Sequence, residues 1–251
     1  MTELWVMRET GQDQREKRLF CFPYAGAGAS VYRDWATHVP ENVQICRIQL
    51  PGRENRLNEP AFTQLEPLVS RLLEAMAPLI TDKQFVLFGH SMGGILVFEL
   101  CRRLAQQGGP LPEKVFLSAT RPPHLADPSP LHHLPDPEFI EALRIRGGTA
   151  EAMLSSPVFL EIFAPALRCD LMIAESWHQP NTPPLPVQLV VLNGRQDNIV
   201  KVAGREVWQR YSTVEPWVID FDGGHFFIHS HAQAVRQAVF SRLNDCTGNE
   251  E

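Results

Sequence analysis

The sequence predicts an α/β fold with a doubly wound, mostly parallel sheet and a helical insertion. Short β-rich runs alternate with helical patterns, as in proteins whose strands are joined by crossover helices. Several runs are almost continuously apolar, which is typical of parallel strands covered on both faces. One long Pro-flanked segment interrupts the alternation. The 251 residues allow one large domain or two small ones.

The strands and the helices between them follow from two periodicities. Strands are predicted at Arg18–Phe22, Val43–Leu50, Phe85–Phe88, Val115–Leu117, Val187–Leu192 and Pro216–Phe221. Apolar side chains spaced along one helical face predict helices over Phe62–Ile80, Met92–Gln107 and Ala232–Leu243. Gly108-Gly109 gives the second helix a C-terminal stop.

No strand is predicted from Arg121 to Pro186. The segment begins with RPPHLADPSP and ends with NTPPLP, and helical patterns cover Glu138–Arg146 and Val158–Ser176. Because structureless loops of this length are uncommon in a compact domain, we predict a helical insertion above the sheet at approximately residues 121–186.

Composition restricts the partners and the compartment. A net charge of −6 disfavours nucleic acid, which needs a basic binding face. No run approaches the roughly 18 apolar residues of a membrane span. The first 18 residues lack the basic start and apolar core of a signal peptide, and the five cysteines are scattered and odd in number. We therefore expect a cytoplasmic chain with reduced thiols.

The stretch FGHSMGG, residues 88–94, places Ser91 between a predicted strand and a predicted helix. Gly89-His90-Ser91-Met92-Gly93 fits the nucleophile elbow, in which a strained turn exposes a serine and small flanking residues relieve crowding. The alternative is a tight turn with an incidental serine. The context favours Ser91 as a nucleophile.

A serine nucleophile needs a base and an acid that orients the base. In hydrolases with this elbow the chain order is Ser, Asp or Glu, His. His225 follows a predicted strand on the loop Gly223-Gly224-His225, and Asp197 follows the apolar strand VQLVVL. Asp170, Asp220 and Asp222 are weaker acids, and His90, His132 and His133 are weaker bases.

Backbone amides that stabilise an oxyanion are expected at two positions. One is the residue after the nucleophile, Met92, and the other is Ala25, in the small-residue loop FPYAGAG after the first strand. This loop matches neither GxGxxG nor GxxxxGK[ST], the phosphate-binding alternatives. A zinc site at His225, His229 and His231 lacks acidic or cysteine partners. We predict no metal and no cofactor.

Eight stretches, spread almost from end to end, resemble a known family. They are FPYAGAGAS (Phe22–Ser30), QLPGRENR (Gln49–Arg56), FGHSMGG (Phe88–Gly94), LPDPEFIEAL and RGG (Leu134–Leu143, Arg146–Gly148), PALRCDLMIAE (Pro165–Glu175), LNGRQDNIV (Leu192–Val200) and GGHFF (Gly223–Phe227). The sequence resembles the type II thioesterases, editing hydrolases that accompany non-ribosomal peptide and polyketide synthases. Its length and short N-terminus are similar to those of the pyochelin-type siderophore members. Tyr24 and Ala27 depart slightly from the family pattern, which bears on acyl preference.

The resemblance implies a single α/β-hydrolase domain over residues 1–251, in which the insertion forms a lid. It implies that Ser91, Asp197 and His225 hydrolyse acyl thioesters on the phosphopantetheine arm of carrier proteins, and that the chain acts as a monomer. Arg53 shapes a loop near the site or makes a structural salt bridge. Arg144 and Arg146 are candidates for carrier docking.

Three other functions remain open from the sequence. They are a medium-chain fatty acyl-carrier-protein thioesterase, a general carboxylesterase, and a non-catalytic binding module with the same fold. Loss of a triad residue would favour the binding module, and none is lost.

Overall fold

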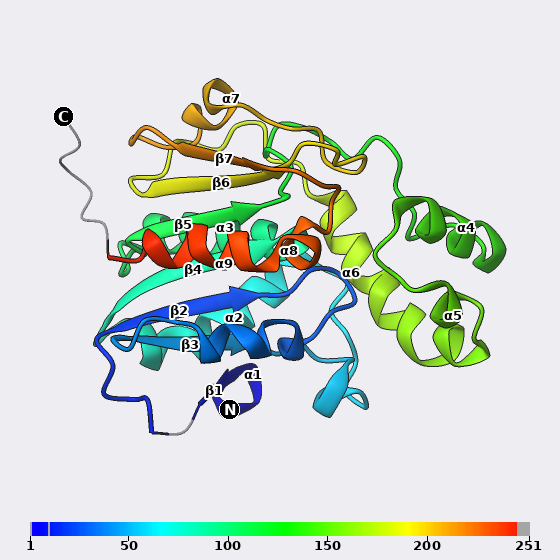
Figure 1. Ribbon diagram of the computed structural model, residues 1–251, viewed down its shortest axis with the longest axis horizontal. Coiled ribbons are helices and arrows are strands. Elements are labelled where there is room, and N and C mark those ends of the chain that lie inside the picture. The colour runs from blue at the N-terminus through cyan, green and yellow to red at the C-terminus, as the bar shows by residue number, and fades with distance from the viewer. Residues whose placement is uncertain (1, 10, 245–251) are drawn as a thin grey trace.

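A twisted sheet forms the centre of the computed structural model, which describes residues 2–9 and 11–244 (Figure 1). Within those residues seven strands pair in the order β1-β3-β2-β4-β5-β6-β7. Their bounds are β1 Val6–Arg8, β2 Lys17–Phe22, β3 Val43–Ile48, β4 Gln84–His90, β5 Lys114–Ser118, β6 Gln188–Gly194 and β7 Trp217–Phe221. Only β1 pairs antiparallel among these strands. The mostly parallel sheet is as predicted.

Helices cover both faces of the sheet (Figure 1). On one face lie α2, Leu65–Ile80, and α3, Met92–Gln107; on the other lie the 3₁₀ segment η1, Ala29–Thr37, and α9, Ala232–Ser241. Side chains of β2 alternate between the two cores, with Phe20 packing on the α2–α3 side and Leu19 on the η1–α9 side. Burial on both faces explains why the strand sequences are almost continuously apolar.

The N-terminal elements α1, Thr2–Trp5, and β1 were missing from the prediction. Strand β1 has three residues, of which two are only partly buried, so it is too short for an alternating pattern to emerge. It pairs through Val6 with Ile48 at the edge of the sheet. The remaining short elements outside the insertion are η2 (Glu54–Arg56), α7 (Arg205–Gln209) and α8 (Phe227–Ser230).

The predicted insertion leaves the sheet after β5 and returns before β6. It contains α4 (Asp136–Arg146), α5 (Glu151–Leu154), the π-helical segment η3 (Phe159–Phe163) and α6 (Ala164–Ser176). Figure 1 shows α4 and α5 projecting from the body, while α6 leads back to it. The lobe has its own core, which includes Phe139 and Phe159. The helix predicted over Val158–Ser176 is divided at Phe163 between the wide turn of η3 and α6.

The cysteines and the possible membrane spans can be compared with the structure only within the described residues. Cys21, Cys46, Cys101 and Cys169 are free thiols, whereas Cys246 lies outside the described residues. Within residues 2–9 and 11–244 no helix combines the length and the apolar character that a membrane crossing requires.

Candidate active site

Ser91 stands at the turn between β4 and α3, with φ 55° and ψ −116°. This combination of a positive φ with a negative ψ is rare for a residue with a side chain and is typical of a nucleophile elbow. The Ser91 N–H donates to the Ser118 carbonyl on the neighbouring strand β5 at 2.8 Å. Glu54, Ser91 and Ala119 are the non-glycine residues with positive φ in the described part of the chain. Strain of this kind concentrates at functional sites.

The glycines around Ser91 permit close backbone approaches. A Cβ on Gly93 would lie 2.2 Å from the Phe22 carbonyl oxygen, and a Cβ on Gly89 would lie 2.0 Å from that of Gly93. No side chain fits at either distance. Gly93 therefore lets the loop after β2, which carries Ala25, pack directly against the elbow.

His225 lies between Ser91 and Asp197. Its Nε2 is 2.9 Å from the Ser91 Oγ, and its Nδ1 is 2.8 Å from the Asp197 Oδ2. The side chains of His225 and Asp197 are only 3% and 2% exposed. The structure brings together the nucleophile, base and acid that the sequence predicts, in hydrogen-bonding geometry.

Strand register and backbone bonds place Asp197 and His225 side by side. Gly194 at the end of β6 pairs with Phe221 at the end of β7, so the loops that carry Asp197 and His225 leave adjacent strands. The other carboxylate oxygen of Asp197, Oδ1, accepts from the Ile199 and Val200 N–H groups at 2.8 and 2.9 Å. These bonds fix the direction in which the Asp197 carboxylate points.

The weaker acids are engaged elsewhere. Asp170 pairs with Arg53, Asp222 with Arg195, and Asp220 accepts from Asn193. Among the weaker bases, His132 contacts Glu175, while His90 Nδ1 lies 2.8 Å from Ser118 Oγ.

Histidines near the site have partners other than a metal. His229 Nε2 lies 2.9 Å from the Tyr24 hydroxyl, and His231 Nδ1 lies 2.9 Å from Ser230 Oγ. In the part of the chain that the structure describes, no three His, Cys, Asp or Glu side chains are grouped to hold a metal ion.

The structure places the two predicted oxyanion donors, Met92 and Ala25, as follows. Met92 is the first residue of α3, where a backbone N–H has no carbonyl one turn before it in the helix. Ala25 lines the same cavity as Ser91 and His225. The oxyanion roles of the Ala25 and Met92 N–H groups stay predictions.

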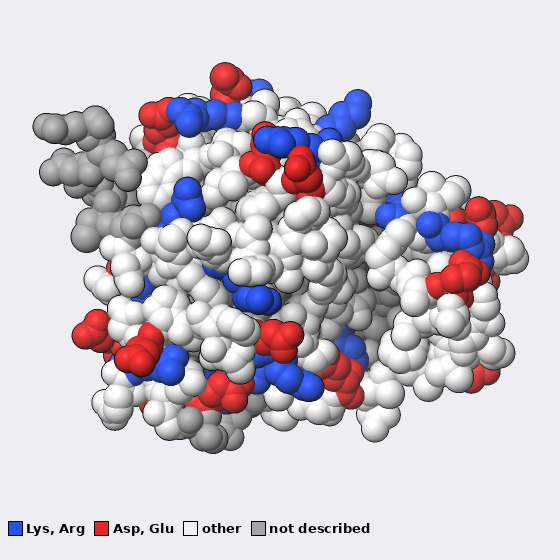
Figure 2. Space-filling view, viewed as in Figure 1, with Lys and Arg blue, Asp and Glu red and all other residues white. Residues whose placement is uncertain are grey.

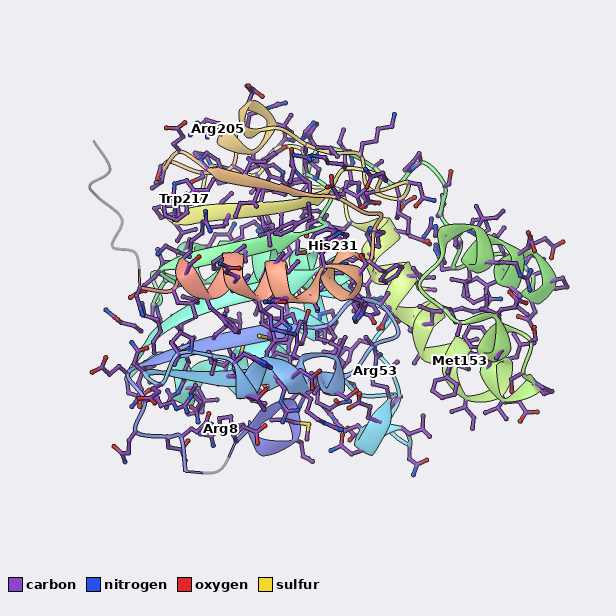
Figure 3. All side chains as sticks on the ribbon, in the orientation of Figure 1. Arg8, Arg53, Met153, Arg205, Trp217 and His231 are labelled. Carbon is purple, nitrogen blue, oxygen red and sulfur yellow. The ribbon has the colours of Figure 1, made fainter. Side chains whose placement is uncertain are left out.

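A cavity of about 500 Å³ opens over Ser91, between the body and the insertion. Figure 2 shows a hollow between the body and the α4–α5 lobe, and Figure 3 labels Arg53 and Met153, which line the cavity from these two sides. The insertion contributes mostly apolar lining: Leu143, Met153, Phe159, Ile162, Phe163, Ala166, Leu167 and Leu171. This lining suits an apolar group attached to the bond that Ser91 attacks.

Aromatic contacts around His90 and His225 were not predicted from the sequence. The Tyr24 ring packs edge-on against His90, Phe226 and His229. Complete burial holds the pKa of His90 well below its ordinary value, and the neighbouring His225 and His229 lower it further. These aromatic contacts join segments that are distant in the sequence through single side chains. No periodic sequence pattern could therefore predict them.

Both interpretations of Arg53 apply. Its guanidinium makes a bidentate ion pair with Asp170 of α6, and the same residue lines the cavity. Arg144 pairs with Glu141 and Glu151, and Arg146 pairs with Glu175. These ion pairs weaken the case for Arg144 and Arg146 as docking residues.

Comparison with known proteins gives a consistent assignment. Residues 17–246 match the family model of the thioesterase domain. The chain is 36% identical to linear gramicidin dehydrogenase LgrE of Brevibacillus parabrevis, over 95% of this chain and 92% of that protein. It is 35% identical to gramicidin S biosynthesis protein GrsT of Aneurinibacillus migulanus, over 95% and 93%.

A solved structure is similar over most of the chain. The thioesterase RedJ, from the prodiginine biosynthetic pathway of Streptomyces coelicolor, superposes with a TM-score of 0.84 at 31% identity, covering 92% of this chain and 87% of that one. The likeness includes the mostly parallel sheet, so the fold is the α/β-hydrolase fold of these thioesterases. By sequence and by structure, the chain belongs to the thioesterase family.

Proposed function

We propose that this chain is a type II thioesterase, in which Ser91, His225 and Asp197 hydrolyse acyl thioesters carried on the phosphopantetheine arm of carrier proteins. The hydrogen-bonded series Ser91–His225–Asp197 supports the proposal most directly. The relatives GrsT and RedJ are named for biosynthetic pathways of the kind that such enzymes accompany.

The proposed reaction has two half-reactions. His225 Nδ1–H donates to Asp197, so that Nε2 accepts the Ser91 hydroxyl proton as Oγ attacks the thioester carbonyl. The C–S bond breaks, and His225 returns the proton to the departing thiolate. In the second half, His225 takes a proton from water, which attacks the acyl-enzyme, and the proton passes back to Ser91.

The Ala25 and Met92 N–H groups are proposed to receive the oxyanion in both tetrahedral intermediates. Each such donor is typically worth about 3 kcal/mol of transition-state stabilisation. The Asp197 carboxylate is proposed to stabilise the imidazolium form of His225.

The insertion at approximately residues 121–186 is proposed to act as a lid that walls the acyl site within a single domain. Its apolar lining and the volume of about 500 Å³ leave room for an acyl group beyond the reacting carbonyl. We further propose that the chain is cytoplasmic, since four scattered cysteines are free thiols. That it acts as a monomer stays a prediction. The siderophore pathway stays a prediction.

Hydrolysis assays on matched substrates test the function. Short and medium acyl groups loaded on a carrier protein are compared with the same acyl groups on coenzyme A and in simple esters, using the wild type and Ser91→Ala. We expect the highest kcat/KM on the loaded carrier and loss of turnover in Ser91→Ala.

Other results would favour other functions. Preference for medium acyl chains alone would favour a fatty acyl-carrier thioesterase, and preference for simple esters a carboxylesterase. Turnover that survives in Ser91→Ala would contradict the mechanism, and inactivity on all substrates would favour the binding module.

A further inference from the structure

A buried ion pair reaches from the insertion to the loop that carries Ala25. Asp170 on α6 accepts the Gly26 N–H at 2.7 Å through Oδ2, although 144 residues separate the two. The same oxygen accepts from Arg53 Nη1, and Asp170 Oδ1 accepts from Arg53 Nη2 at 3.0 Å. The side chains of Arg53 and Asp170 are 7% and 3% exposed.

The pair holds the loop at more than one point. Arg53 Nη1 lies 3.5 Å from the Ala27 carbonyl, and Arg53 Nε donates to the Pro51 carbonyl at 3.1 Å. The Ala27 N–H in turn donates to the Tyr24 carbonyl, which closes a tight turn over Ala25 and Gly26. Ala25 therefore lies in a closed turn, and the amide that follows it in this turn, the Gly26 N–H, is bound to Asp170. Together the turn and this bond fix the direction of the Ala25 N–H.

We propose that Asp170, supported by Arg53, is a positioning residue for the oxyanion hole. This inference rests on the proposed function. Asp170 does not touch the reacting atoms. Its carboxylate orients the Gly26 amide, and through the shared peptide chain it sets where the Ala25 N–H points. The stabilisation of the oxyanion thereby depends on the position of α6. The helix that lines the cavity also helps to form the oxyanion hole.

Replacement of Asp170 by Asn tests the proposal. Asp170→Asn removes the negative charge that pairs with Arg53. It also leaves one carbonyl oxygen for three donors, the Gly26 N–H and the two Nη groups of Arg53, because the new NH2 group cannot accept. Since removal of an oxyanion donor lowers kcat by about 100- to 1,000-fold, we expect its misdirection to lower kcat by about 10- to 100-fold. Arg53→Lys keeps the charge but loses the bidentate fork, and we expect a smaller fall in kcat. This second variant covers the case in which Asp170→Asn fails to fold.

Glu99→Gln provides the matched control. Glu99 is also a buried carboxylate, with a side chain 3% exposed, and it pairs with Arg102 and accepts from Trp177 Nε1 at 2.9 Å just beyond α6. It does not contact the Tyr24–Ala27 turn. We expect Glu99→Gln to lower the melting temperature in the manner of Asp170→Asn while kcat stays within about 2-fold of the wild type.

Two ligands separate an oxyanion effect from ordinary binding. An octylthio trifluoromethyl ketone forms a charged hemiketal with Ser91 Oγ, whereas octyl-CoA has a methylene in place of the thioester carbonyl. We expect Asp170→Asn to lose affinity for the ketone in parallel with kcat and to bind octyl-CoA within about 2-fold of the wild type.

Three results would overturn the positioning role: a kcat for Asp170→Asn equal to that of Glu99→Gln, unchanged ketone affinity, or equal losses for both ligands. A failure of the proposed function is distinguishable, because it would be seen in the wild type and in Ser91→Ala before any positioning variant is measured.

Discussion

Gly148 lies against the ring of Phe226, so close that a Cβ on Gly148 would be 2.0 Å from Phe226 Cε2. Phe226 directly follows His225, and the two rings meet edge-on at 5.1 Å. The segment between α4 and α5 therefore rests on the residue next to the proposed base.

We expect Gly148→Ala to lower kcat/KM by about 10- to 100-fold, because the new methyl group displaces Phe226 and with it His225. Gly147→Ala is the matched control: its φ of +76° is close to the +86° of Gly148, but a Cβ there meets nothing within 4 Å. Both variants place a side chain on a residue with a similar positive φ. Steady-state kinetics that fall equally in both would show that strain, and not the contact with Phe226, is responsible.

Asp197→Asn should lower kcat by about 10,000-fold with a much smaller change in KM, as in serine hydrolases that lose the acid of this series. The amide allows the wrong tautomer of His225, whose Nε2 then carries a proton and accepts none from Ser91. Asp222→Asn, at a side chain 71% exposed and paired with Arg195, should leave kcat unchanged. A comparable loss in the two variants would contradict the assignment of the acid.

The stability of the fold should fall in acid because of His90. Burial lowers the pKa of His90 in the folded state, so below the ordinary value near 6.5 the unfolded chain binds a proton that the folded chain does not. The free energy of unfolding then decreases as the pH falls. For one such group the slope reaches about 1.4 kcal/mol per pH unit.

Denaturant titrations of the wild type and His90→Gln between pH 5 and pH 7, a range set by the ordinary histidine pKa near 6.5, measure this contribution. We expect the variant to have a lower free energy of unfolding at neutral pH and a shallower decline in acid. Parallel curves for the two proteins would show that His90 does not carry the acid sensitivity.

Gly93→Ala should destabilise the fold by about 1–3 kcal/mol, since its methyl group would lie 2.2 Å from the Phe22 carbonyl oxygen and the backbone has to move. Gly108→Ala, at φ +64° with nothing within 4 Å, is expected to cost less. Chemical denaturation compares the two. Equal losses would indicate that the close approach of the β2 loop to the elbow contributes little.

Long elements with a clear period were predictable from the sequence, and short ones were not. Helix α3 begins at Met92 and ends at Gln107, as predicted, because its apolar stripe is bounded by the elbow and by Gly108. Strand β1 has three residues and a polar surrounding sequence, so it gave no signal. The 3₁₀ segment η1 was not predicted either, because a kink at Tyr32 interrupts any regular helical period within its nine residues.

Some features of the candidate site were also predictable from the sequence, and others were not. Ser91, Asp197 and His225 were predictable because each follows a strand of one parallel sheet, and the carboxyl ends of such strands meet at one edge. The contacts of Asp170 with Gly26 and of Tyr24 with His229 join single side chains across 144 and 205 residues. Sequence alone left Arg53 undecided because a guanidinium next to a turn is compatible with either role.

The residues with positive φ have a consequence for any attempt to make this protein more robust. Glu54, Ser91 and Ala119 have a positive φ that glycine adopts without steric strain, so glycine at each position relieves strain in the folded chain. A screen that rewards heat resistance alone would therefore collect glycine at these positions. Glycine at Ser91 would raise thermal stability but remove the proposed nucleophile. Thermal stability and turnover therefore have to be selected together.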